Sequence, residues 1–210
     1  MLSAVLSFLF IRTAVFPSFG GGRGGFLPVY LQYLILLAGV VVTTMLLWYE
    51  IDRNNPLLHK VCTGIIKGNC NAILAGKASK VFSWLSWSEV GFFYFAGSFL
   101  CIVFQPSSPF PYIFNLLALP YIIFSIYYQG VVAKEWCLFC LSVQALLLLG
   151  GVNVIVNHLW NYLNNLNIPT VSMALLLYLL PVALWLQHKT SRIKIAGGKA
   201  YQTGIFAIEI

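Results

Sequence analysis

The sequence predicts an all-α integral membrane protein, and both its composition and its pattern of apolar segments lead to this class. Of its 210 residues, 60% are hydrophobic and only 8% are charged, and the mean hydropathy is +0.87. Soluble domains carry about 25% charged residues, so a larger buried core does not explain this deficit. Apolar runs close to the roughly 20 residues that cross a bilayer as a helix recur along the chain.

The predicted membrane spans share a low charge content and are separated by polar or charged connections. The spans cover residues 26–49, 89–104, 112–128, 136–156 and 170–187. A long charged connection precedes the second span, and a short polar return at residues 129–135 precedes the fourth. We therefore expect both connections to lie on the same side of the membrane.

Four regions follow from this division. Residues 1–25 form an interfacial segment that ends in the hinge GGGRGG, because its opening apolar run is too short to span a bilayer. Residues 26–156 form the main helical bundle. Residues 157–187 hold an Asn-rich connection and the fifth span, and residues 188–210 form a basic tail.

The formal net charge of +7 reflects cations that flank the membrane spans rather than a nucleic-acid surface. Most Lys and Arg residues fall on the side of the two connections, which the positive-inside rule would make cytoplasmic. Disulfide chemistry requires an oxidising compartment, however, and the sulfur-bearing connection is long. We expect the cysteines to face the oxidising side.

Four of the five cysteines form two pairs, and the predicted topology places both pairs on one side. Cys62 and Cys70 lie in the long connection, and Cys137 and Cys140 open the fourth span. The fifth, Cys101, lies in an apolar run without polar neighbours in the sequence and is interpreted as a small core residue.

The position of the second pair predicts redox chemistry. A helix N-terminus stabilises a thiolate, and Cys137 gains most from it. Cys137 is expected near the surface, within reach of Cys62 and Cys70, whereas Cys140 lies one turn deeper. The natural partner of Cys140 is then a lipid-soluble electron acceptor such as a quinone. Electrons would pass from a soluble dithiol to Cys62 and Cys70, then to Cys137 and Cys140, and finally to the quinone.

Three motifs in this order resemble the vitamin K epoxide reductase family: CTGIIKGNC, NAILAGKASKVFSW and WCLFC. The resemblance covers residues 26–156. It implies a four-helix bundle around a quinone, menaquinone or ubiquinone, with a fifth transmembrane helix like the one that precedes a thioredoxin-like domain in bacterial members. Cys140 would lie beside the ring, Cys137 would exchange with Cys70, and Cys62 with the partner.

The same resemblance implies a location in a bacterial inner membrane, with a periplasmic thioredoxin-like partner supplied by another chain or a further domain. Three positions depart from the family pattern, and one of them is Gln144, which stands where a Tyr follows the CxxC in some members. Gly76 stands where a Ser or Thr is expected, with Ser79 the nearest hydroxyl. The polar residue that bonds the quinone is not plainly matched, so Ser88, Glu89 and Gln144 are the candidates for this role.

Other interpretations stay open for these residues. The cysteine pairs can be structural disulfides in a membrane scaffold or a transporter subunit. A four-cysteine metal site lacks a supporting His, so no metal is expected. Glu89 also suits the start of a helix. Trp84, Trp87 and Trp136 suit either an aromatic belt at the lipid interface or a lid over the quinone.

Overall fold

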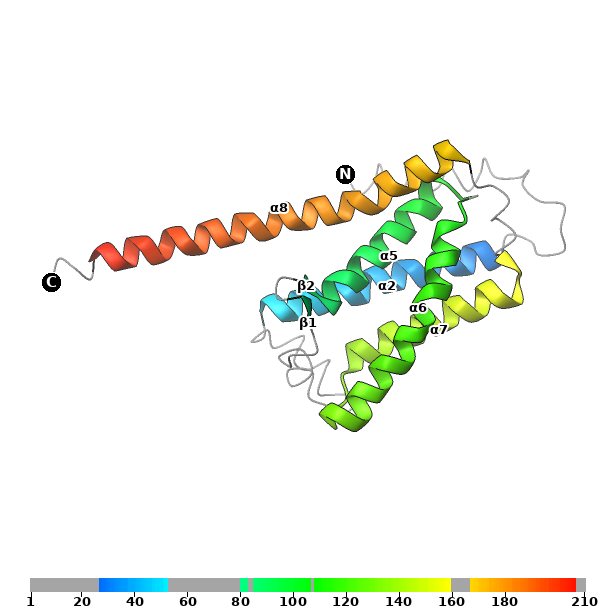
Figure 1. Ribbon diagram of the computed structural model, residues 1–210, viewed down its shortest axis with the longest axis horizontal. Coiled ribbons are helices and arrows are strands. Elements are labelled where there is room, and N and C mark those ends of the chain that lie inside the picture. Colours follow the sequence, from blue (N-terminus) through cyan, green and yellow to red (C-terminus); the bar gives the residue numbers. More distant parts are fainter. Residues whose placement is uncertain (1–26, 53–79, 83–84, 107, 160–166, 207–210) are drawn as a thin grey trace.

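The computed structural model describes residues 27–52, 80–82, 85–106, 108–159 and 167–206, and it consists almost entirely of helices (Figure 1). Five of these helices are long and apolar enough to cross a membrane. The prediction of an all-α membrane protein with five spans is confirmed. Cys62, Cys70, Gly76, Ser79 and Trp84 lie outside the described residues.

The helix boundaries extend most of the predicted spans. The helices are α2 (Leu27–Ile51), α5 (Trp87–Phe104), α6 (Phe110–Tyr127), the π-helix η2 (Tyr128–Ala133), α7 (Leu138–Val156) and α8 (Ile168–Phe206). The predicted polar return at 129–135 is wrong over most of its length, because η2 continues α6 to Ala133. Lys134 then ends the helix in a left-handed conformation, with φ of 52°.

A short hairpin precedes α5, and the sequence did not predict it. Strand β1 (Lys80–Phe82) pairs antiparallel with β2 (Leu85–Ser86), with Lys80 opposite Ser86. Because β2 runs directly into α5, the hairpin fixes the direction in which the chain enters that helix. The side chain of Ser86 then serves as the N-cap of α5.

The bundle core forms where α2 packs against α5 and α7, and where α6 packs against α7. Leu36, Phe95, Tyr112 and Leu147 belong to its buried cluster. The contact between α2 and α5 is close at Gly39, where an added Cβ would lie 2.0 Å from Cδ1 of Phe95. Small residues let membrane helices approach in this way.

Cys101 belongs to the core and also makes a polar contact there. Cys101 is fully buried, as predicted for a core residue, but it is not without polar company. Its thiol donates a hydrogen bond to the Ser108 hydroxyl at 3.3 Å. Ser108 lies in the turn between α5 and α6, seven residues after Cys101. It is outside the apolar run, so the sequence around Cys101 does not reveal this partner.

Helix α8 packs against α5 and continues past the other helices (Figure 1). Gly97 admits the ring of Tyr178, whose hydroxyl lies 2.7 Å from the Ser98 hydroxyl. The predicted fifth span is therefore part of a longer helix. The helix continues into the basic tail predicted at residues 188–210, as far as Phe206.

The ends of α2, α5, η2 and α7 meet at one end of the bundle, which we call the thiol end. Glu50 of α2 contacts Ser88 of α5, and the rings of Tyr49 and Phe139 lie 6.4 Å apart. Asp52 and Lys80, which flank the long connection, lie in the segments that reach this end. The described chain thus enters and leaves that connection at the thiol end.

Candidate functional site

Cys137 is the N-cap residue of α7, and two hydrogen bonds fix it there. It has an extended backbone, with φ of −106° and ψ of 115°, and its sulfur accepts the backbone N–H of Cys140 at 3.4 Å. Its own N–H donates to Oε1 of Gln129 at 3.0 Å. Side-chain acceptors at this position satisfy helix amides that would otherwise lack partners.

The burial of the two sulfurs differs from the expectation. Cys137 is fully buried in a cluster with Leu46, Tyr49 and Phe139, whereas Cys140 is half-buried. The prediction that Cys137 lies near the surface is therefore wrong for this state of the molecule. Exchange of its sulfur with a disulfide requires that its apolar cover move aside.

The pKa of the Cys137 thiol is lowered from its ordinary value. The main cause is a hydrogen bond from the Cys140 side chain, which together with the backbone N–H groups of Cys140 and Phe139 outweighs the effect of burial. Hydrogen bonds to a thiolate favour the charged form. The direction agrees with the helix-start argument from the sequence, but the neighbouring thiol contributes most.

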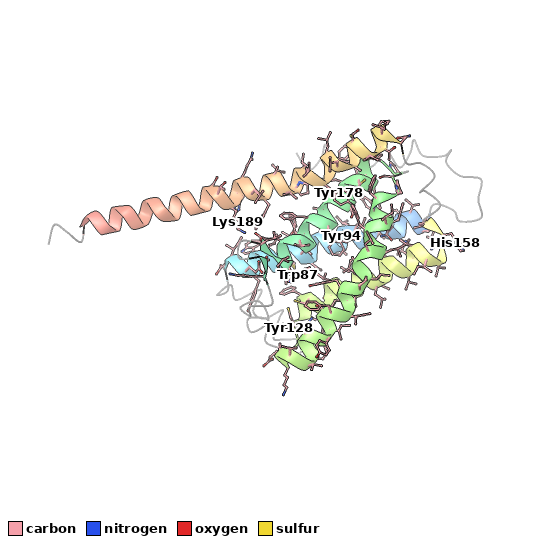
Figure 2. All side chains as sticks on the ribbon, viewed as in Figure 1. Trp87, Tyr94, Tyr128, His158, Tyr178 and Lys189 are labelled. Carbon is pink, nitrogen blue, oxygen red and sulfur yellow. The ribbon has the colours of Figure 1, made fainter. Side chains whose placement is uncertain are left out.

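Cys140 lines a cavity of about 410 Å³ between α2, α5, α6 and α7. Its walls are mostly apolar and aromatic, with Trp87 and Tyr94 from α5 and Tyr128 from η2 (Figure 2). Small-molecule pockets of roughly 300–1,000 Å³ commonly combine such walls with a few polar groups. A flat, apolar ring compound with carbonyl oxygens, which is the chemistry of a quinone, fits this donor set.

The polar groups of the cavity wall centre on the hydroxyl of Ser125. The side-chain amide of Gln129 donates to it at 3.3 Å, and the amide of Gln144 also donates to it. Ser125 and Gln129 line the cavity, but Gln144 does not. Gln144 thus lies one hydrogen bond behind the wall, and its Oε1 is buried with no hydrogen-bond partner among the described residues.

Ser125 and Gln129 were missed because the sequence places them in apparently unrelated contexts. Ser125 lies inside an apolar run, and Gln129 begins the stretch that was predicted as a polar return. Their spacing of four residues puts them on one face once α6 continues into η2. The spacing of four residues could have identified the pair from the sequence, but only if the helix were expected to continue past Tyr128.

The three residues predicted to bond the quinone occupy different places. Ser88 is buried and lines the cavity, and Gln144 stands behind Ser125. Glu89 is not among the residues that line the cavity. It completes a capping box with Ser86 at the start of α5, which is the alternative that a helix-start acid allowed.

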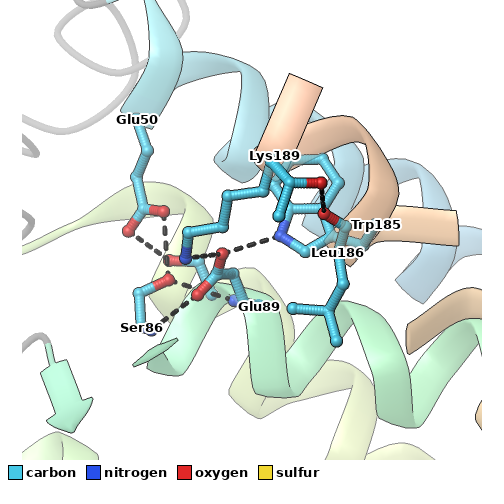
Figure 3. Close-up of polar contacts among 8 residues, drawn as sticks. Glu50, Ser86, Glu89, Trp185, Leu186 and Lys189 are labelled. Atoms are coloured by element: carbon cyan, nitrogen blue, oxygen red, sulfur yellow. Dashed lines mark hydrogen bonds and ion pairs between the residues drawn. The ribbon is translucent and has the colours of Figure 1, made fainter. Parts of the chain in front are cut away.

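Glu89 also joins α5 to α8 (Figure 3). Its Oε1 accepts hydrogen bonds from Nε1 of Trp185 and from Nζ of Lys189, each at 2.7 Å. The side chain of Glu89 is 5% exposed and that of Lys189 is 35% exposed. The ion pair therefore holds α8 at the thiol end, outside the cavity.

The tryptophans divide between the two expected roles. Trp87 lines the cavity and packs against Tyr121, with ring centroids 4.9 Å apart. Trp136 is 41% exposed, which suits an interfacial position. In the part of the chain that the structure describes, no group of three or more His, Cys, Asp or Glu residues is placed to hold a metal ion.

Comparisons with known proteins bear on this arrangement. The model of the vitamin K epoxide reductase family matches residues 30–155, which include α2, α5, α6 and α7 almost completely. Searches of curated proteins and of solved structures returned no match. Because the family model covers more than half of the 210 residues, and a cysteine pair opens α7 beside a cavity within that range, the chain belongs to the vitamin K epoxide reductase family.

Proposed function

We propose that this protein is a membrane thiol:quinone oxidoreductase that supports disulfide bond formation in a partner protein. Members of its family are oxidoreductases that use quinones and typically work with thioredoxin-like partners. The observation that carries the proposal is that Cys140 lines an apolar cavity of about 410 Å³ while Cys137, three residues before it, caps the same helix. A scaffold with structural disulfides needs no thiol in a cavity wall.

In this proposal each residue of the pair has its own task. Cys137, with its lowered pKa, supplies the thiolate that exchanges with Cys70, and Cys62 exchanges with the partner. Cys140 faces the cavity in which Ser88, Ser125 and Gln129 hold the quinone. When bound there, the quinone supplies the capacity to accept two electrons and two protons.

The order of the exchange steps rests on the sequence and on the flanking segments. Cys62 and Cys70 lie outside the described residues, but Asp52 and Lys80 on either side of them belong to segments that reach the thiol end. A partner disulfide that enters there meets Cys137 only after Leu46, Tyr49 and Phe139 uncover it.

The decisive experiment replaces Cys140 by Ser and measures quinone reduction by the purified, reduced protein. We expect Cys140→Ser to abolish reduction of both menaquinone and ubiquinone, because one sulfur alone cannot form the disulfide that releases two electrons. Cys101→Ser is the matched control, since Cys101 lies outside the cavity lining and a Ser can still donate to Ser108. Full activity of Cys140→Ser would overturn the proposal.

The partner and the orientation have separate tests. Replacing Cys70 by Ala leaves the Cys62 thiol without its pair, so this protein is expected to trap a mixed disulfide between Cys62 and the partner in cells. Mass spectrometry then identifies the attached chain and tests whether it is a thioredoxin-like protein. We also propose that the thiol end faces the periplasm of a bacterial inner membrane. A membrane-impermeant thiol reagent applied to whole cells should then label Cys62 or Cys70, and labelling only after lysis would reverse the orientation.

A further inference from the structure

Glu50 occupies an unusual place for a carboxylate, in the last turn of α2 at the thiol end. It is half-buried, and each of its carboxylate oxygens accepts a hydrogen bond from a serine hydroxyl where β2 joins α5 (Figure 3). Oε1 accepts from Ser88 at 2.9 Å, and Oε2 accepts from Ser86 at 3.1 Å. Both hydroxyl groups therefore point their protons at Glu50.

The dipole of α2 does not favour a carboxylate at this position. The C-terminal end of a helix is the negative end of its dipole, where a carboxylate is unfavourable, and the last turn of α2 holds no basic residue. The start of α5 does not need Glu50 as a cap, because Ser86 and Glu89 already form a complete capping box. Residues that are unfavourable for the helix in which they lie are expected chiefly at functional sites.

Ser88 connects this carboxylate with the cavity. It is 4% exposed, and it lines the same cavity as Cys140. Among the described residues that line the cavity, none is an Asp, a Glu or a His. Two further polar residues of the wall, Ser125 and Gln129, bond to each other and so end at a side-chain amide, which does not readily take up or release protons. The hydroxyl groups of Thr43 and Tyr94 bond to a backbone carbonyl and to an amide. The remaining hydroxyl groups of the lining are those of Tyr121 and Tyr128. The path through Ser88 is therefore the described route from the cavity to a carboxylate.

Charged residues of α5 and α8 adjoin Glu50 through Ser86. On α5, Glu89 shares Ser86 with it, because the Ser86 N–H donates to Oε2 of Glu89 at 2.9 Å. On α8, Lys189 pairs with Glu89. On its own chain segment, the exposed Asp52 follows two residues later.

We propose that Glu50 is a proton-relay residue that acts through the Ser88 hydroxyl and carries protons between the aqueous thiol end and the cavity. The inference rests on the proposed function. Closing the Cys137 and Cys140 dithiol forms one S–S bond, breaks two S–H bonds and releases two electrons and two protons. A quinone takes up two of each to become a hydroquinone. The two protons released by the dithiol balance the two that the quinone takes up. Glu50 takes up a proton at the thiol end and passes one through Ser88 to the cavity, so it ends in the state in which it began.

The test uses the full chain in detergent or vesicles and compares four variants with the wild type. In Glu50→Gln the side chain keeps its size, and its Oε1 can still accept from Ser88, but it cannot release a proton. We expect the rate constant for quinone reduction to fall about 10- to 100-fold, within the range that proton transfer by a positioned side chain contributes. Ser88→Ala should cause a similar loss.

The double variant and a charge control separate a relay from other effects. If both residues serve one path, Glu50→Gln with Ser88→Ala should be no slower than the worse single variant, because effects of residues that act as a unit do not add. Asp52→Asn removes the same charge near the same helix end. We expect it to change the rate by less than about twofold, since exposed charges are screened.

A binding measurement provides the readout that does not depend on turnover. Quinone affinity, followed by quenching of tryptophan fluorescence with Trp87 in the cavity wall, should change by less than about twofold in Glu50→Gln, because a relay affects the rate and not ground-state binding. Loss of affinity equal to the loss of rate would overturn the relay, and so would an equal loss of rate in Asp52→Asn. If the wild type itself reduces no quinone, the proposed function fails; if it does and Glu50→Gln keeps pace, only the relay fails.

Discussion

Two serines organise the polar contacts near the thiol end, and their surroundings differ in charge. Ser125, 8% exposed, accepts hydrogen bonds from the neutral amides of Gln129 and Gln144. Ser86, on the outer flank, lies between the carboxylates of Glu50 and Glu89, and Lys189 pairs with Glu89. The neutral cluster forms the wall of the cavity, and the charged cluster fastens α5 to α2 and α8.

The difference follows from the cost of burying charge. An ionised group in the cavity wall would lose its hydration and compete with any apolar ligand, whereas a neutral amide needs only hydrogen-bond partners. On the flank, the Lys189 side chain keeps about a third of its exposure, so the ion pair remains partly hydrated. The polar cluster at the cavity wall is therefore neutral, whereas the cluster that joins α5 to α2 and α8 on the flank is charged.

The largest effect is expected at the thiol pair, which the neutral cluster positions through Gln129. Because the pKa of Cys137 is lowered, its thiolate persists to lower pH than that of an ordinary Cys, and the pH at which its alkylation rate is half-maximal should lie below that of an ordinary Cys. Cys140→Ala removes the main cause of the lowered Cys137 pKa, so the pH at which alkylation of Cys137 is half-maximal should rise. Each unit of that move lowers the rate at acidic pH about tenfold.

Site-resolved mass spectrometry of the reduced protein across a pH series measures this effect. A small neutral reagent is needed, because Cys137 is fully buried. An unchanged midpoint in Cys140→Ala would mean that the neighbouring thiol does not stabilise the Cys137 thiolate.

The next effect comes from breaking the neutral cluster itself. Ser125→Ala leaves the buried amides of Gln129 and Gln144 without the acceptor they share, so the free energy of unfolding should fall by about 1–3 kcal/mol. Ser142→Ala is the control, since Ser142 only donates to the Leu138 carbonyl within its own helix. Denaturant titration in mixed micelles compares the two, and equal losses would show that Ser125 has no special role.

The two clusters also differ in how far the sequence predicted them. The spans and the Cys137 and Cys140 pair follow from apolar length and spacing, which are local properties. Ser88 was identified because it stands at the start of a span. The roles of Ser125, Gln129 and Glu50 depend on contacts between helices far apart in the sequence, so their partners become visible only when α2, α5, η2 and α7 are placed together.

The same reasoning explains the errors. Sequence predicts that a helix start is near water, but Cys137 is covered by residues from α2 and by Phe139. The continuation of α6 into η2 was hidden by Gln129 and Gly130, which are typical of a turn. The length of α8 was hidden by its basic residues, because charge marks the end of a span but not the end of a helix.

A smaller effect is expected when the charged cluster is broken. Lys189→Met removes the ion-pair partner of Glu89 while Trp185 and Ser86 continue to donate to the carboxylate. Because Lys189 is 35% exposed, solvent screens much of the pair, and the loss should be about 0.5–1 kcal/mol. The exposed Lys134→Met variant is the control. A loss as large as that of Ser125→Ala would contradict the distinction between the clusters.

The smallest effect tests whether α8 depends on charge at all. Along the same interface, Tyr178 and Ser98 form a neutral contact of 2.7 Å well inside the span, where Gly97 lets the tyrosine ring approach α5. Tyr178→Phe keeps the ring and removes only the hydroxyl, so the free energy of unfolding should fall by about 0.6 kcal/mol, typical of hydrogen bonds between membrane helices. The 58% exposed Tyr127 gives the control, Tyr127→Phe. A loss for Tyr178→Phe above that for Lys189→Met would mean that α8 is held chiefly by its neutral contact, and the flank would then follow the same rule as the cavity wall.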